Sequence, residues 1–199
     1  MNDKIIHVFA GPNAVGKSTL GEEFAYYKGI PFVNPEEISR KQFSLYKEEI
    51  NFIMLHHIMD IDIKTALDDS DQVIIESNLH DIKAYKFIDY YISKYRASSI
   101  CYFHYTDDIN ILKRRAKQRP KHLGHMVPES MLEERYNKSF ELIIERIHSF
   151  DEIHFLDNSK EQERPDLILE VLDGELNYIN QDLSFDWTNK IINELTNSE

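Results

Sequence analysis

The sequence predicts an α/β fold in which helices flank a parallel sheet. Short apolar runs, rich in β-branched residues, alternate with longer amphipathic segments, as strands and helices do in parallel α/β domains. Several of the short runs are apolar on both faces, which is typical of strands buried in a parallel sheet. A glycine-containing loop joins the first run to the first helical segment.

The strands that we expect are short runs of four to six residues: Ile5–Ala10, Ile30–Val33, Val73–Glu76, Ile100–Tyr105, Ile153–Leu156 and Leu167–Leu172. Between these runs lie segments with a spacing of three or four residues, at Leu20 and Phe24, at Ile53, His57 and Asp60, and at Met131, Arg135 and Ser139. Residues with this spacing share one face of a helix, so each segment predicts a helix.

We expect one domain over residues 1–199, because a chain of 199 residues is close to the usual size of a single domain and contains no internal repeat or linker-like stretch. The last segment, about 182–197, places large apolar residues four apart, at Leu183, Trp187, Ile191 and Leu195. This stripe predicts a C-terminal helix that packs back on the domain, and an interaction surface is the alternative.

The composition favours a folded protein that does not act mainly on nucleic acid. Apolar residues make up 42% of the chain and charged residues 29%, which are ordinary globular values. The formal net charge is −12, whereas binding to a phosphate backbone requires a basic face. Cys101 is the single cysteine, which fits a reducing compartment. No signal-peptide pattern and no apolar run of about 20 residues are present, so we expect a cytoplasmic protein without a membrane partner.

The glycine loop carries the strongest signal for chemistry. The P-loop pattern G-x-x-x-x-G-K-[ST] is matched by Gly11-Pro12-Asn13-Ala14-Val15-Gly16-Lys17-Ser18, and Thr19 follows. The glycines allow backbone N–H groups to turn inward around an anion, and the following helix adds its positive end. We therefore expect Gly11 to Thr19 to bind ATP, with Lys17 at the β/γ-phosphates as a catalytic group and the Ser18 hydroxyl on Mg²⁺.

Two comparisons narrow the class of P-loop protein to the small-molecule and nucleotide kinases. A guanine-reading N-K-x-D motif is missing, since Asn189-Lys190-Ile191-Ile192 lacks the aspartate. The signature of ABC transporter ATPases is missing too. Kinases of the remaining class add an acceptor site near the second strand and a basic lid over the phosphates.

A carboxylate follows the second expected strand, in Asn34-Pro35-Glu36-Glu37. Helix capping explains three of these residues, with Asn34 as N-cap, Pro35 at the first helical position and Glu37 completing a capping box. Glu36 has no such duty, and strand carboxyl ends line the ligand crevice of a parallel sheet. We expect Glu36 to accept the acceptor's hydroxyl proton or to orient that hydroxyl. A plain first-turn acid is the alternative.

A second carboxylate ends the third expected strand, in Ile75-Glu76-Ser77-Asn78. Glu76 fits two roles that the sequence does not separate: a Walker-B-like group near Mg²⁺, or a group that holds an acceptor hydroxyl. Asn78 is expected on the acceptor side of the same site.

The predicted lid is a run of six Lys or Arg residues without an acid, Lys113-Arg114-Arg115-Ala116-Lys117-Gln118-Arg119-Pro120-Lys121. Arg115 and Arg119 are four apart and share one helix face, so both guanidinium groups could clamp a polyphosphate. A solvated helix face and a nucleic-acid patch are the alternatives, and the second is disfavoured because no aromatic residues interleave.

The chain resembles the zeta-toxin-like P-loop kinases over about residues 5–159. The resemblance is carried by the P-loop, by Phe32-Val33-Asn34-Pro35-Glu36-Glu37-Ile38, by Ile75-Glu76-Ser77, by the basic run leading to Gly124-His125-Met126-Val127-Pro128, by Glu134-Arg135-Tyr136-Asn137-Lys138-Ser139 and by Leu156-Asp157-Asn158-Ser159. It implies an ATP-dependent kinase, with UDP-N-acetylglucosamine as the acceptor in zeta toxins proper, and it allows for a protein antitoxin as partner.

Carried over residue by residue, the resemblance implies roles for six positions. The family's catalytic acid falls on Glu36, its acceptor-side glutamate on Glu76, its phosphate-binding arginines on Arg115 and Arg119, a basic substrate-site residue on Arg135 and a nucleotide-site residue on Asn158. The chain departs from the family at Glu36, where aspartate is more common, and at Ala14, where glycine is usual. Alanine is tolerable there if that position has a negative φ.

The sequence thus predicts a P-loop kinase that transfers the γ-phosphoryl group of ATP to a hydroxyl of a small-molecule acceptor, such as a UDP-N-acetyl-sugar. The alternatives are a nucleotide-dependent switch or ATPase without an acceptor, and a nucleic-acid 5′-end kinase, which the net charge disfavours.

Overall fold

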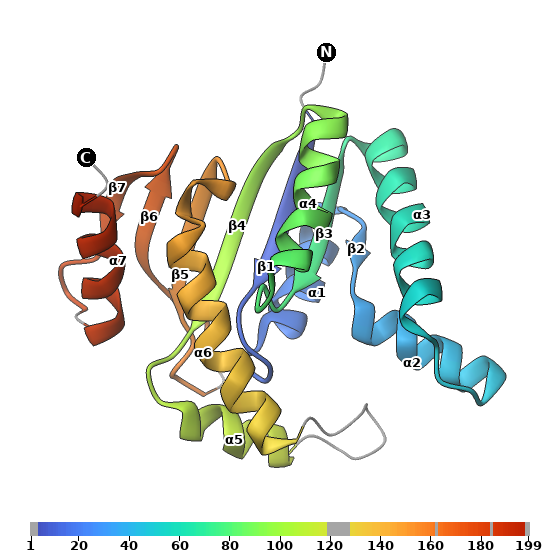
Figure 1. Ribbon diagram of the computed structural model, residues 1–199, viewed down its shortest axis with the longest axis horizontal. Helices are drawn as coiled ribbons and strands as arrows, with labels where there is room; N and C mark the ends of the chain where they lie inside the picture. Colours follow the sequence, from blue (N-terminus) through green and yellow to red (C-terminus); the bar gives the residue numbers. More distant parts are fainter. Residues whose placement is uncertain (1–3, 119–127, 162, 184, 198–199) are drawn as a thin grey trace.

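The computed structural model describes residues 4–118, 128–161, 163–183 and 185–197. Within these residues one sheet of seven strands runs in the order β2-β3-β1-β4-β5-β6-β7, with helices on both faces (Figure 1). The strands are β1 Ile5–Ala10, β2 Phe32–Val33, β3 Gln72–Ser77, β4 Ser98–Tyr105, β5 Glu152–Asp157, β6 Asp166–Leu172 and β7 Glu175–Ile179. The helices are α1 Lys17–Lys28, α2 Pro35–Tyr46, α3 Phe52–Ser70, α4 Ile82–Tyr95, α5 Ile109–Gln118, α6 Glu129–Glu145 and α7 Asp186–Asn197, with a 3₁₀ turn at Ile147–Ser149.

The first five strands confirm the predicted parallel α/β sheet. β1 pairs in parallel with both β3 and β4, β2 pairs with β3, and β4 pairs with β5. The parallel prediction is wrong for β6, which runs antiparallel to β5. The connection from Asp157 to Asp166 is too short for a crossover between parallel strands, which takes about a dozen residues or more.

β7 is a strand that the sequence analysis missed. It pairs with β6 in an antiparallel hairpin whose turn holds Asp173 at φ 51° and Gly174 at φ 81°. Two successive positive φ values are typical of the tight hairpin turn that Asp-Gly favours. The dipeptide was therefore a readable signal for this hairpin.

The main hydrophobic core lies between the sheet and the helices α3, α4, α6 and α7. α4 and α6 lie over the face of the sheet that Figure 1 shows in front, and α1 lies behind the sheet. The Tyr105 ring of β4 packs 4.5 Å from Phe140 of α6 and 5.5 Å from Trp187 of α7, between ring centroids. Trp187, Ile191 and Leu195 are buried, so the apolar stripe of α7 packs on the same core.

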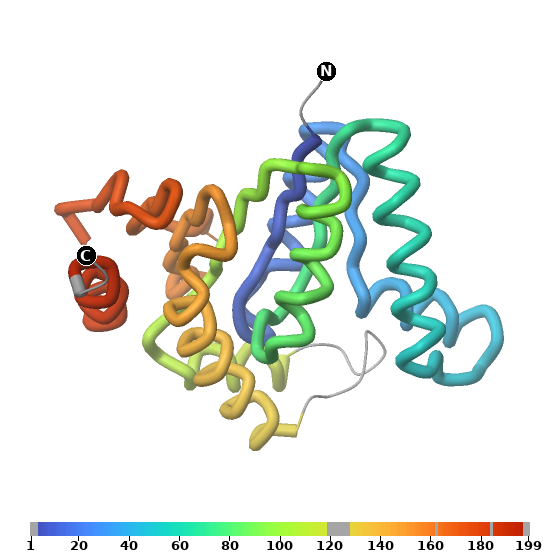
Figure 2. The backbone as a smooth tube through the Cα atoms, turned by 45° about the horizontal axis from the view of Figure 1, so that its top comes forward, coloured from blue at the N-terminus to red at the C-terminus, as the bar shows by residue number. Residues whose placement is uncertain are grey.

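Different helices lie beside the two outer strands of the sheet, β2 and β7. In Figures 1 and 2 the α2–α3 pair lies beside β2 at one end, and α7 lies beside β6 and β7 at the other. None of the described helices combines the length and apolar character needed to cross a membrane. The segments that follow the parallel strands gather along the lower edge of the sheet in Figure 1, which is the edge where α/β folds hold their ligands.

Candidate active site

The P-loop joins β1 to α1 and depends on two glycines. Gly11 has φ 129° and Gly16, the N-cap of α1, has φ 109°. A Cβ atom on Gly11 would lie 2.1 Å from the backbone oxygen of His104 on β4. Only glycine satisfies both the positive φ and this close approach. The strand, loop and helix therefore follow one another as the sequence predicted.

Ala14 departs from the sequence expectation. A negative φ was the condition under which alanine is tolerable there, and the residue instead has φ 64°. A left-handed conformation costs a residue with a Cβ atom about 1–2 kcal/mol. The Ala14 methyl is buried in the hydrophobic core cluster, and this burial offsets part of that cost.

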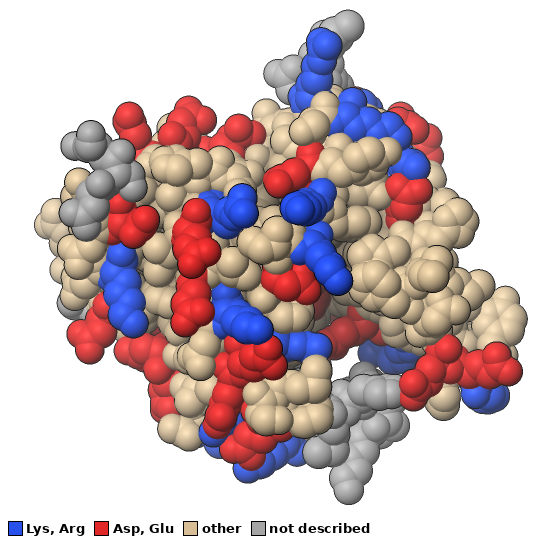
Figure 3. Space-filling model, viewed as in Figure 1, with Lys and Arg blue, Asp and Glu red and all other residues tan. Residues whose placement is uncertain are grey.

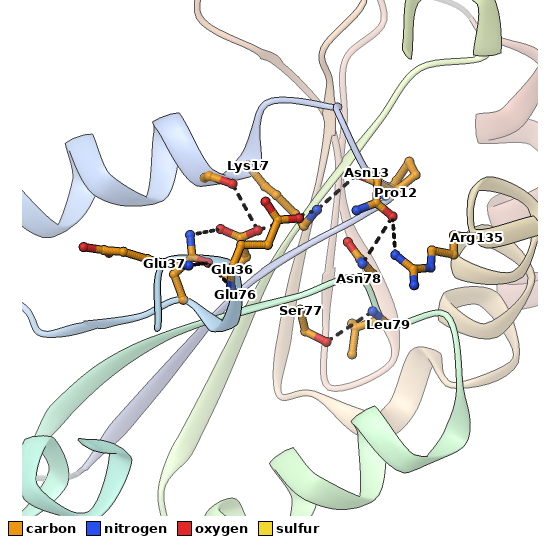
Figure 4. A network of polar contacts seen from close by, with 12 residues as sticks. Pro12, Asn13, Lys17, Glu36, Glu37, Glu76, Ser77, Asn78, Leu79 and Arg135 are labelled. Carbon is orange, nitrogen blue, oxygen red and sulfur yellow. Dashed lines mark hydrogen bonds and ion pairs between the residues drawn. The ribbon is translucent and has the colours of Figure 1, made fainter. Parts of the chain in front are cut away.

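Lys17 is a buried cation at the start of α1, where the P-loop ends. The residue is 4% exposed. Its Nζ donates a hydrogen bond to the Pro12 carbonyl oxygen at 3.1 Å and lies 3.8 Å from Glu76 Oε1 (Figure 4). The lysine charge is thus held between the P-loop backbone and the carboxyl end of β3, as an anion site on this loop requires.

Glu76 is the point where three elements meet. The carboxylate is 5% exposed at the end of β3. Its Oε1 accepts a hydrogen bond from Ser18 Oγ of α1 at 3.1 Å, and its Oε2 accepts one from Asn34 Nδ2 at 2.9 Å. A hydroxyl beside a carboxylate, next to the P-loop, is a donor set of the oxygen type that Mg²⁺ prefers.

Glu36 lies in the first turn of α2, next to Lys17 and Glu76. Asn34 caps the helix, accepting hydrogen bonds from Glu36 N at 2.8 Å and Glu37 N at 3.1 Å, and Pro35 opens the helix as predicted. The Glu36 side chain is exposed and extends toward Lys17 and Glu76 in Figure 4. The first half of the predicted capping box is confirmed by the bond from Glu37 N to Asn34, whereas the Glu37 carboxylate lies 2.7 Å from Lys41 Nζ, one turn further on.

Asn13 connects the P-loop to two distant elements. Its Oδ1 accepts hydrogen bonds from Asn78 Nδ2 at 3.4 Å and from Arg135 Nη1 of α6 at 3.1 Å (Figure 4). Asn78 and Arg135, both expected in the substrate site from sequence, are thus brought together on one atom of the loop. Asn13 was predicted from the sequence as a nucleotide-binding residue, and its link to Asn78 and Arg135 was not predicted.

The described part of the basic run, residues 113–118, divides into two groups. Lys113 lies 3.0 Å from Glu129 and also contacts Glu133, and Arg114 lies 2.7 Å from Glu161. Arg115 instead contacts the P-loop and the segment after β5: its Nη1 donates to the Val15 oxygen at 3.4 Å, and its Nη2 donates to the Lys160 oxygen at 3.0 Å.

Arg119, Pro120 and Lys121, the rest of the predicted lid, lie outside the described residues, as do Gly124 to Val127, which belong to the resemblance. Lys113 and Arg114 thus fit the alternative of a charged helix face. Arg115 contacts the P-loop and stays a predicted lid residue.

Asn158 lies beside the P-loop on the β5 side. Its Oδ1 is 3.0 Å from His104 Nδ1, and a Cβ atom on Gly16 would lie 3.4 Å from its Nδ2. His104 is 1% exposed, and burial lowers the pKa of its imidazole to about 4. We place the proton of the neutral ring on Nδ1, because the amide oxygen of Asn158 accepts. His104 was missed in sequence, although a histidine within an apolar strand was its visible signal.

A further group of potential metal ligands lies away from the P-loop, on β5 and β6. His154 and Glu170 are directly opposite each other in the antiparallel register, and Glu152 shares their face. The two ring nitrogens of His154 lie 2.5 Å from Glu152 Oε1 and 3.2 Å from Glu170 Oε1. This group was not predicted, because the three residues come together only through the register of β5 and β6.

Comparison with known proteins supports the fold. No protein-family model matches the chain, and no curated protein matches it. The crystal structure of AvrRxo1-ORF1:AvrRxo1-ORF2 with sulphate ions matches with a TM-score of 0.64 at 12% identity, covering 90% of this chain and 62% of that chain. The AvrRxo1-ORF1:-ORF2 structure with ATP matches with a TM-score of 0.62 at 11% identity, over 95% of this chain and 63% of that chain.

A putative kinase from Chloroflexus aurantiacus matches with a TM-score of 0.50 at 17% identity, covering 69% of this chain and 80% of that chain. The present chain spans less than two thirds of the AvrRxo1-ORF1:-ORF2 chains that it matches with sulphate and with ATP. At these identities the likeness establishes the fold alone, a mostly parallel sheet flanked by helices.

Proposed function

We propose that this chain is a kinase that transfers the γ-phosphoryl group of Mg²⁺-bound ATP to a hydroxyl of a small-molecule acceptor. The observation that carries the proposal is the meeting of Lys17, Ser18 and Glu76 at the P-loop, with the Glu36 carboxylate directed toward them. A slow nucleotide switch needs the first three groups, but it does not need a carboxylate on the acceptor side.

The nucleotide side of the site is built from the loop and the start of α1. The inward-turned amides and the Lys17 ammonium would hold the phosphates, where preorganised positive charge lowers the barrier to transfer. Mg²⁺, when bound, neutralises charge on the phosphates. The Ser18 hydroxyl donates to Glu76, which leaves its oxygen lone pairs available for the cation. This contact favours the metal side for Glu76 over the acceptor role.

The acceptor side is built from the first turn of α2. Glu36 would accept the proton of the acceptor hydroxyl, or orient that hydroxyl for attack. Arg115 and Arg135, which contact backbone or side-chain oxygens of the P-loop, would meet the charge that develops on the transferred group. Resemblance to zeta-toxin-like kinases favours a nucleotide sugar as acceptor. The complexed state of AvrRxo1-ORF1 with AvrRxo1-ORF2 supports a search for a protein partner.

Nucleic acid is the weaker choice of acceptor. On the face that carries α4 and α6, acidic side chains are interspersed with Lys and Arg (Figure 3). The formal net charge of −12 opposes binding to a phosphate backbone as well.

The experiment is ATP turnover with and without a panel of acceptors: UDP-N-acetyl-sugars, other hydroxyl metabolites and a 5′-hydroxyl oligonucleotide. We expect stimulation by a small hydroxyl compound and recovery of its phosphate ester. Turnover that no acceptor stimulates would favour the switch, and a phosphorylated oligonucleotide would favour the end kinase. Lys17→Ala provides the inactive control.

A further inference from the structure

We infer that Asn34 is a positioning residue that uses the two ends of one side-chain amide to fix both sides of the proposed site. One end holds the Glu76 carboxylate, and the other holds the helix turn that carries Glu36. The inference rests on the proposed function for the meaning of these two glutamates. The sequence pattern gives Asn34 only the role of a helix cap.

Both ends of the Asn34 amide are engaged. The residue is 4% exposed. Its Oδ1 accepts from Glu36 N at 2.8 Å and Glu37 N at 3.1 Å, and its Nδ2 donates to Glu76 Oε2 at 2.9 Å. The amide cannot be turned over, because that would set its N–H groups against two N–H donors and its oxygen against a carboxylate.

The contact with Glu76 determines where that carboxylate points. The terminal torsion of a glutamate side chain is broad and roughly two-fold, so the side chain alone does not orient its two oxygens. Asn34 tethers Oε2, and this leaves Oε1 facing Ser18 Oγ at 3.1 Å. An oriented acceptor for the Ser18 proton keeps the serine lone pairs directed to the proposed Mg²⁺. Outer-shell contacts of this kind typically change metal affinity or activity by about 10–100-fold.

The two contacts together explain why asparagine stands at this position. Serine, threonine or aspartate would cap α2 as well. None of them presents a capping oxygen and an amide donor in one planar group, and aspartate would place a second carboxylate against buried Glu76. One side chain therefore links the acceptor-side helix to the metal-side carboxylate.

The test separates the two ends of the amide. Asn34→Ser, with Asn34→Thr as a second cap-preserving variant, keeps the capping oxygen and removes the donor to Glu76. Asn51→Ser is the matched control, because the exposed Asn51 caps α3 through Met54 N at 2.9 Å and lies on another helix. The readouts are ATP affinity by calorimetry as a function of Mg²⁺ concentration, melting temperature, and kcat against KM.

We expect Asn34→Ser to weaken the affinity of the ATP complex for Mg²⁺ by about 10-fold or more and to lower kcat. The affinity for ATP without Mg²⁺ should stay close to that of the wild type. Its melting temperature should fall further than in Asn51→Ser, because the buried Glu76 carboxylate loses a hydrogen-bond donor, so both variants are assayed well below their melting temperatures. A Mg²⁺ dependence equal to that of Asn51→Ser would overturn the inference and leave Asn34 as a cap alone.

A double-mutant cycle identifies the partner. If Asn34 acts through Glu76, Asn34→Ser should cost little more Mg²⁺ affinity in a Glu76→Gln background, whereas additive losses would contradict the inference. The calorimetry also distinguishes failure of the two proposals. A wild type that binds Mg²⁺ with ATP but transfers nothing refutes the kinase and leaves the inference standing. A wild type whose ATP binding ignores Mg²⁺ refutes the inference.

Discussion

Replacement of Glu36 by glutamine should remove most phosphoryl transfer and leave the fold almost unchanged. Glutamine keeps the size of the side chain and loses the basic oxygen. The side chain is exposed in the first turn of α2, where a lost charge–dipole interaction costs about 0.3–1 kcal/mol. In a protein of this size, about 1 kcal/mol lowers the melting temperature by about 2–4 °C.

The effect on activity should be far larger. A positioned general base contributes about 10²–10⁴-fold to the rate, while ATP affinity should hardly change because the P-loop, Lys17 and Ser18 lie on other elements. Glu37→Gln is the matched control: it removes a charge from the same helix turn, but its carboxylate pairs with Lys41. Transfer rate, ATP affinity and melting temperature are measured on both variants.

Two results would refute this reasoning. If Glu36→Gln transfers phosphate at a rate close to that of the wild type, the base is Glu76 or no residue, since loose phosphoryl-transfer transition states need little help from a base. If Glu37→Gln loses as much activity as Glu36→Gln, the rate depends on the total negative charge of the first turn of α2 and not on the Glu36 carboxylate in particular.

Three further predictions concern the P-loop and its surroundings. Lys17→Ala should lower turnover at least about 10²-fold, and near-normal turnover in a variant with an unchanged circular dichroism spectrum would contradict the P-loop assignment. Arg115→Ala should lower kcat more than it raises the acceptor KM. Lys113→Ala, whose ammonium pairs with acids outside the loop, should change neither. An unaltered kcat in Arg115→Ala would contradict a catalytic role and leave the basic segment as a general attractor of anions. Burial lowers the pKa of His104 to about 4, so between this value and the unfolded pKa of about 6.5 the unfolded state binds more protons than the folded state. The contribution of His104 to the free energy of unfolding is therefore fully present above about pH 6.5 and is lost as the pH falls toward 4. Denaturant unfolding at pH 7, 5.5 and 4.5 should show this loss, and a constant free energy of unfolding would contradict it.

The parts of the fold that depend on local patterns could be predicted from the sequence. Apolar runs and helical spacing gave the parallel strands, and the motif placed the P-loop between β1 and α1. The direction of β6 depends on the length of the connection after Asp157, and β7 depends on the Asp173-Gly174 turn. Both signals are present in the sequence, but neither is a hydrophobic pattern, whereas the predicted strands were all recognised from hydrophobic patterns.

The candidate site was predictable where sheet geometry determines it. Glu76 meets Ser18 and Lys17 because β3 is hydrogen-bonded to β1 and both strands end at the same edge. The bond from Asn34 to Glu76 was not predictable in the same way. In the sequence, helix capping fully explains an asparagine at position 34. The second role of its amide, as the donor to Glu76, follows only from the surroundings of the side chain in the fold.

Backbone conformation was the other limit. The left-handed φ of Ala14 is dictated by the path of the loop between β1 and α1 and not by the residue itself. Likewise, His104 meets Asn158 only because β4 and β5 place their carboxyl ends side by side. Contacts of this kind follow from register and loop path, which residue type alone does not specify.

The central claim is that phosphate moves from ATP to a small hydroxyl acceptor. The most direct measurement incubates the protein with ATP labelled in its γ-phosphoryl group and a small-metabolite extract, and follows the label by mass spectrometry, with Lys17→Ala in parallel. We predict that label appears in a phosphorylated metabolite in step with ADP, and only with the wild type. Label recovered solely as inorganic phosphate would contradict the claim.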